Sequence, residues 1–156
     1  MMKARLKKTA IVTGAAFVLI QFVQPARNQS GQVLDTDISR VVTVPESVRG
    51  IFSKSCYDCH SNNTRYPWYA NIQPGGWFMA YHVRNGKEKM NFSDFGSYTK
   101  RRQESKLKSI ASQIEDDAMP LCSYTLLHPD ARLAPGEKDA IIQWANTARD
   151  SLTSKN

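Results

Sequence analysis

Two cysteines and a histidine stand within one five-residue segment, Cys56-Tyr57-Asp58-Cys59-His60. Thiols at this spacing can each add to one of the two vinyl groups of a single haem, and a histidine directly after the second thiol can bind the iron. The motif therefore predicts one covalently attached haem c, with Cys56 and Cys59 as its anchors and His60 as the proximal iron ligand.

Other functions of a CxxC pair fit this chain less well. A structural zinc site usually needs four protein ligands, and the only further thiol is Cys122, with His82 and His128 distant and unpaired. A thioredoxin-like redox pair would need a βαβ context, whereas the flanking sequence has helical character. A plain disulfide between thiols this close would be strained.

The N-terminal segment indicates export from the cytoplasm. Four basic residues stand at the start of the chain: Lys3, Arg5, Lys7 and Lys8. An apolar stretch follows over residues 10–23, long enough for the core of a signal peptide and shorter than the roughly 20 residues of a membrane span. Because no clear small-x-small cleavage site follows, residues 1–26 favour an uncleaved membrane anchor over a cleaved signal peptide. A cleaved signal peptide would release the protein into the periplasm. An uncleaved anchor would hold it on the periplasmic side of the inner membrane.

The charge of the exported part does not indicate a nucleic-acid partner. The formal net charge of the chain is +7, but removing the four N-terminal residues from the 21 basic side chains leaves 17 against 14 acidic ones. Two haem propionates would lower the excess further. The charge therefore gives no argument for a nucleic-acid partner. With a haem, the expected partners are redox proteins, and also a membrane if the N-terminal segment is retained.

The remainder of the chain predicts one all-α domain. Residues 27–44 are polar without a sustained period and suggest a tether, which places the haem-binding domain at 45–151. Helices are expected over 45–57, 76–84, 98–117 and 135–151, the third of them from apolar residues at i, i+3, i+4 and i+7. The loop over 61–75 is rich in aromatic residues, which suggests that it packs on an apolar surface.

A low-spin electron-transfer haem needs a second axial ligand. The candidates are Met119, His82, His128, Met79 and Met90. Met119 precedes a proline, which stiffens the loop and could hold a thioether against iron. Methionine also raises the reduction potential relative to histidine. These points favour Met119, with His82 more suited to a position near the haem edge and His128 to ordering its own turn.

Several segments in order resemble known haem proteins. These are residues 50–56 before the motif, the CxxCH segment with residues 61–69, then 92–95, 119–121 and 124–131, and a terminal helix with Trp144. The arrangement is similar to class I cytochromes c and, more closely, to the bacterial haem-binding domain family of exported CxxCH proteins common in Bacteroidetes. The resemblance covers roughly residues 45–150 and implies a small cytochrome c-like helical fold. It also implies covalent haem binding by Cys56, Cys59 and His60, with Met119 as distal ligand.

These observations favour a monohaem c-type cytochrome that carries electrons and is not an enzyme. A haem-based sensor, in which a ligand displaces Met119, is one alternative. A peroxidase-like enzyme is another, since His82 could serve as an acid-base group beside an open iron position. Cys122 is expected to be a partly buried residue without a role, or else to form an intermolecular disulfide.

Overall fold

The computed structural model describes residues 2–154, and the regular structure within this range is helical, without a named strand. The α-helices are α1 (Met2–Ile20), α2 (Ile38–Val41), α3 (Glu46–Ser55), α4 (Tyr57–His60), α5 (Gly75–Lys89), α6 (Lys100–Glu115), α7 (Cys122–Leu127) and α8 (Pro135–Thr153). The 3-10 segments are η1 (Trp68–Asn71), η2 (Phe92–Ser97) and η3 (Pro129–Ala131). The expected all-α class is confirmed.

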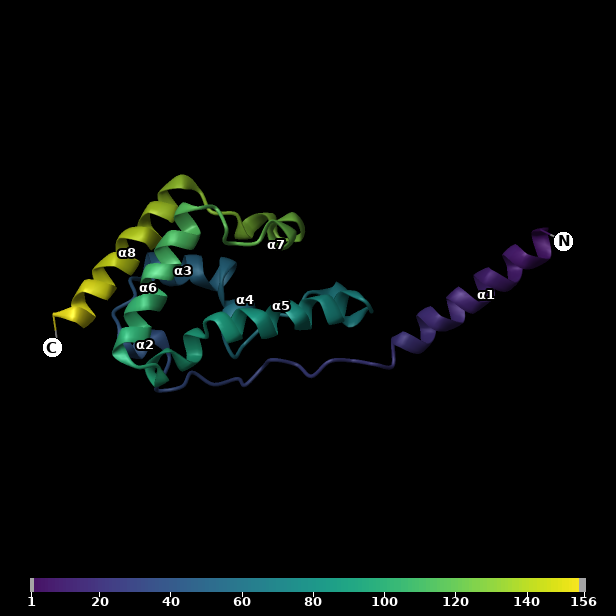
Figure 1. Cartoon of the computed structure of the whole chain (residues 1–156), viewed down its shortest axis with the longest axis horizontal. Helices are drawn as coiled ribbons and strands as arrows, with labels where there is room; N and C mark the ends of the chain where they lie inside the picture. Colours follow the sequence, from purple (N-terminus) through teal and green to yellow (C-terminus); the bar gives the residue numbers. More distant parts are fainter. Residues whose placement is uncertain (1, 155–156) are drawn as a thin grey trace.

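The N-terminal helix α1 stands apart from the helical body formed by α2 to α8 (Figure 1). None of its residues is buried. Between residues 2 and 154, no helix is both long enough and apolar enough to cross a membrane.

The helices expected over 98–117 and 135–151 are present as α6 and α8, which lie side by side (Figure 1). Over residues 107–114 of α6 and 141–152 of α8, each helix buries an apolar residue at every third or fourth position, as expected for an apolar stripe. The buried residues include Leu107, Ala111 and Ile114 of α6 and Ile141, Trp144, Ala145 and Ala148 of α8. This pair forms one wall of the core.

The CxxCH motif folds as the single helical turn α4, directly after α3. The helix expected over 45–57 is divided at Cys56, where the backbone has φ −126° and ψ −45°. The N–H groups of Cys59 and His60 both donate to the carbonyl of Cys56, over 3.2 and 3.0 Å. The two thiols and the imidazole are therefore carried on one rigid turn.

Part of the segment 27–44, which the sequence suggests as a tether, packs into the core. Asp37 accepts a hydrogen bond from the Ser39 N–H over 3.0 Å and so caps the short helix α2. Ile38 is completely buried and Val42 nearly so. A four-residue helix is too short to produce a recognisable apolar period, which explains why the sequence pattern does not reveal it.

α5, expected over 76–84, continues to Lys89 and crosses the motif turn at very short range. Gly86 makes this possible, because a Cβ built there would lie 2.5 Å from the carbonyl oxygen of Cys59. Only a residue without a side chain lets the two backbones approach so closely. Gly86 thus fixes the position of α5 against the CxxCH turn.

We expect Gly86→Ala to destabilise the protein by about 1–3 kcal/mol, the usual range for overpacking a core. Gly50→Ala is the matched control, because a Cβ at Gly50 in α3 would meet no atom within 4 Å. There alanine should raise stability, by up to about 1 kcal/mol, through its better helix propensity. Urea unfolding followed by circular dichroism measures both changes. Equal effects at the two positions would contradict the close contact.

Candidate functional site

A cavity of about 420 Å³ lies between α3, α4, α6 and the segment before η2. Its apolar wall consists of Phe52, Met90, Phe92, Ile110, Ile114, Met119, Pro120 and Ile141. Of the predicted site residues, Cys56, His60 and Met119 line this cavity, whereas Cys59 does not. Among the five candidate distal ligands, only Met119 and Met90 do so.

His60 is held in the form that binds a metal. Its Nδ1 lies 3.0 Å from the carbonyl oxygen of Met90. A carbonyl can only accept, so Nδ1 carries the proton and Nε2 keeps its lone pair. Burial lowers the pKa of His60, which favours the neutral ring. A hydrogen bond of this kind orients most metal-binding histidines. The acceptor is the backbone carbonyl of Met90, so Met90 lies beside His60. Met119 reaches the cavity from a different segment, after the end of α6.

Both motif thiols are free. Burial, together with the charge of Cys59, raises the pKa of the Cys56 thiol to about 12. Burial and the charge of Asp58 raise that of Cys59 to about 11. A zinc site would need thiolates with further ligands, and no group of three or more His, Cys, Asp or Glu suited to a metal ion occurs in the described part of the chain.

Met119 reaches the cavity because α6 ends in a Schellman motif. Asp117 has φ +55°, the left-handed conformation that usually follows a helix end of this type. The N–H of Asp117 donates to the carbonyl of Ile114 over 3.3 Å, and that of Ala118 to Gln113 over 3.0 Å. The chain therefore reverses sharply and returns Met119, itself bonded through its N–H to Gln113, to the cavity wall.

The two remaining histidines have other environments. His82 packs against Phe78 on α5, with ring centroids 4.3 Å apart, and does not line the cavity. His128 stacks on Tyr124, and its Nδ1 lies 3.1 Å from the Tyr124 carbonyl. It therefore orders its own turn, as expected, through the backbone. Cys122 is exposed rather than partly buried.

Two lysines also line the cavity, Lys89 at the end of α5 and Lys106 on α6. Neither ammonium group has an ion-pair partner among residues 2–154. Unpaired cations beside an apolar cavity suit a ligand with an apolar body and carboxylates at its edge. Together with a neutral histidine and a thioether, these residues fit a haem.

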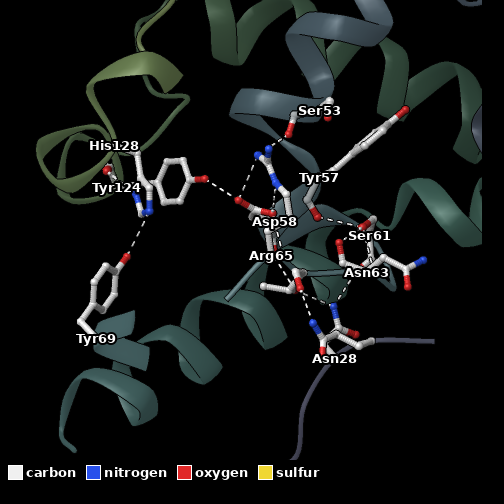
Figure 2. A network of polar contacts seen from close by, with 12 residues as sticks. Asn28, Ser53, Tyr57, Asp58, Ser61, Asn63, Arg65, Tyr69, Tyr124 and His128 are labelled. Carbon is white, nitrogen blue, oxygen red and sulfur yellow. Dashed lines mark hydrogen bonds and ion pairs between the residues drawn. The ribbon is translucent and has the colours of Figure 1, made fainter. Parts of the chain in front are cut away.

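Asp58 links the motif turn to α7, a connection that the sequence pattern does not indicate (Figure 2). Its carboxylate is buried and accepts a hydrogen bond from the Tyr124 hydroxyl over 2.7 Å. It also accepts from the backbone N–H and the Nε of Arg65, over 3.0 and 3.2 Å. The Arg65 guanidinium donates further to the Ser53 carbonyl over 2.6 Å. Asp58 thus joins the turn that carries His60 to the segment that follows Met119.

We expect Tyr124→Phe to lower the free energy of unfolding by about 1.5–3 kcal/mol, the usual value of a hydrogen bond to a charged group. The hydroxyl is half-buried, and its removal leaves one carboxylate oxygen of Asp58 with a weaker set of donors. Tyr81→Phe is the matched control, since Tyr81 is exposed and its hydroxyl has no hydrogen bond within residues 2–154. Thermal unfolding of both variants tests this, and similar losses would show that the bond contributes little.

An all-helical body with a neutral histidine and a methionine on one apolar cavity has the character of a haem protein. Comparison with known protein families agrees: residues 15–147 match the haem-binding domain family, and the chain belongs to it. The family expected from the motifs is thereby confirmed. No curated protein and no solved structure matches the chain.

Proposed function

We propose that this protein is a monohaem c-type cytochrome that transfers electrons and catalyses no reaction of its own. The observation that carries the proposal is the cavity, in which His60 offers a free Nε2 while Met119 approaches from the end of α6. One imidazole and one thioether form an axial pair that favours ferrous iron relative to two histidines. His82, which a peroxidase-like reaction could use, does not line this cavity.

Each group of site residues would have its own role in holding the haem. The thiols of Cys56 and Cys59 would form thioether bonds to the two vinyl groups, His60 and Met119 would bind the iron, and Lys89 and Lys106 would receive the propionates. When bound, the haem supplies a one-electron couple between ferrous and ferric iron. The apolar wall excludes water, which limits how strongly solvent stabilises the ferric charge.

The same proposal includes the compartment and the partners. Haem attachment of the c type takes place outside the cytoplasm, which agrees with the basic and apolar N-terminal segment. The protein would act in the periplasm, or on the periplasmic face of the inner membrane if residues 1–26 are retained. Its partners would be redox proteins.

An absorption spectrum of the full chain, matured with a haem-attachment system, tests the function. We expect a six-coordinate ferric haem with the weak far-red band typical of a methionine ligand, and reversible reduction without loss of the haem. A five-coordinate, high-spin spectrum with rapid binding of added ligands would instead favour a sensor or an enzyme.

A further inference from the structure

Large apolar side chains are exposed at the end of the helical body where η1 leads into the first half of α5. The exposed fractions are 75% for Trp68, 45% for Ile72, 38% for Trp77, 54% for Phe78 and 53% for Tyr81. We call these five residues the aromatic face. In the described part of the chain beyond residue 33, the remaining exposed large apolar side chains are Leu126 and Leu127. The sequence suggests that the aromatic residues of the loop 61–75 pack on an apolar surface. Trp68 of this loop is largely exposed, so no part of the described chain covers it.

The aromatic face follows from how α5 packs. Met79, Val83 and Gly86 are buried on one side of this helix, so Trp77, Phe78 and Tyr81 occupy the opposite side. η1 packs against the buried side of α5, where Ala70 meets Met79 and Val83, and adds the exposed Trp68 next to the start of this helix. α7, which carries the two exposed leucines, is connected to η1 through the hydrogen bond between Tyr69 and His128, 3.4 Å long.

The N-terminal segment is fastened to this same part of the body. The indole Nε1–H of Trp77 donates to the carbonyl of Val23 over 2.8 Å. The fully buried Gln73 donates its backbone N–H to the Gln21 side chain over 2.8 Å and its Nε2 to the Gln24 side chain over 3.0 Å. In Figure 1 the chain accordingly passes from α1 to the body beside the N-terminal end of α5.

The chemistry of this region fits a lipid surface. The apolar stretch 10–23 leads directly to the aromatic face, and Phe22 and Val23 at its end are exposed as well. Tryptophan and tyrosine are enriched where proteins meet the interface of a bilayer, because their rings are amphipathic. Arg84 lies over the ring of Tyr81, 6.0 Å from its centroid, and supplies a cation for lipid phosphates.

We propose that the aromatic face rests on the surface of a phospholipid bilayer, with residues 10–23 inserted beside it. Lys89, at the opposite end of α5, stands twelve residues beyond Trp77, about 18 Å along the helix at 1.5 Å per residue. The cavity edge marked by Lys89 and Lys106 is left to the aqueous phase, where a soluble redox partner can approach it.

The test uses the haem-loaded full chain reconstituted into vesicles of phosphatidylcholine and phosphatidylglycerol that contain a lipid with a photoreactive acyl chain. After illumination, mass spectrometry locates the attached lipid. We expect adducts on residues 68–81 as well as on 10–23, and none on α6 or α8. Adducts confined to 10–23 would overturn the proposal, because the body would then stand clear of the bilayer.

Variants make the test specific. Trp68→Gln combined with Phe78→Gln removes two of the most exposed side chains of the aromatic face, and we expect at least a fivefold loss of adducts over residues 68–81. Val33→Gln is the matched control, since Val33 is 67% exposed and lies outside the face; it should leave the yield unchanged. A protein-protein crosslinker that instead joins two copies through residues 68–81 would assign the face to a second copy and overturn the proposal. The absorption spectrum of the same sample reports on the haem separately.

Discussion

Replacing Met119 by leucine is expected to abolish the far-red band of the ferric protein and to lower its midpoint potential. The thioether favours ferrous iron, so its loss stabilises the ferric state. We expect the fall to be a substantial part of the roughly 0.8 V range over which axial ligands set haem potentials. Leucine has nearly the volume of methionine, so the cavity wall keeps its shape while the sulfur is lost. Titration with added imidazole should also show a newly accessible iron.

The cavity offers a matched control for this change. Met90 lines the same wall, and its contact with His60 is made by the backbone carbonyl, which a substitution retains. Met90→Leu should therefore keep both the band and the potential. His82→Ala should also keep the band, because its imidazole does not reach the cavity. A spectrum that is insensitive at Met119 but altered at His82 would instead indicate a bis-histidine haem of lower potential.

The long helices could be predicted from the sequence because each presents an apolar stripe over several turns. α6 and α8 end within a few residues of the expected positions, and the pattern of Leu107, Ala111 and Ile114 is the one that is buried. α2 could not be predicted, since Ile38 and Val42 alone define no period. Its position depends on tertiary packing, which local propensity does not encode.

The candidate site, like the fold, could be predicted only where its residues are close together in the sequence. The CxxCH spacing is local, and it predicts Cys56, Cys59 and His60 as site residues before any fold is known. That Met119 shares their cavity depends on the reversal at Asp117, an aspartate in a conformation more typical of glycine. The burial of Asp58 depends on Tyr124, which stands 66 positions away in the chain. Only the folded structure brings these groups together.

Replacing both Cys56 and Cys59 by alanine is expected to remove the covalent haem completely. In the proposed attachment, each thiol adds across one vinyl group, its sulfur to one carbon and its hydrogen to the other. The reaction consumes no oxidant or reductant, and it leaves a thioether that survives denaturation. Denaturing gel electrophoresis with haem staining should therefore show a stained polypeptide for the native chain and none for the double variant.

The single variants and a control separate attachment from general damage to the fold. Cys122 is exposed and lies outside the cavity, so Cys122→Ala should retain full staining. Cys56 lines the cavity whereas Cys59 faces the contact with Gly86. If the turn keeps its conformation, Cys56→Ala should reduce staining more than Cys59→Ala. In Cys56→Ala the remaining thiol is that of Cys59, which must move to reach the cavity. Equal staining of the two single variants would show that the turn rearranges during attachment. Staining that persists in the double variant would exclude these thiols as the anchors, while His60 and Met119 could still bind a haem without covalent bonds.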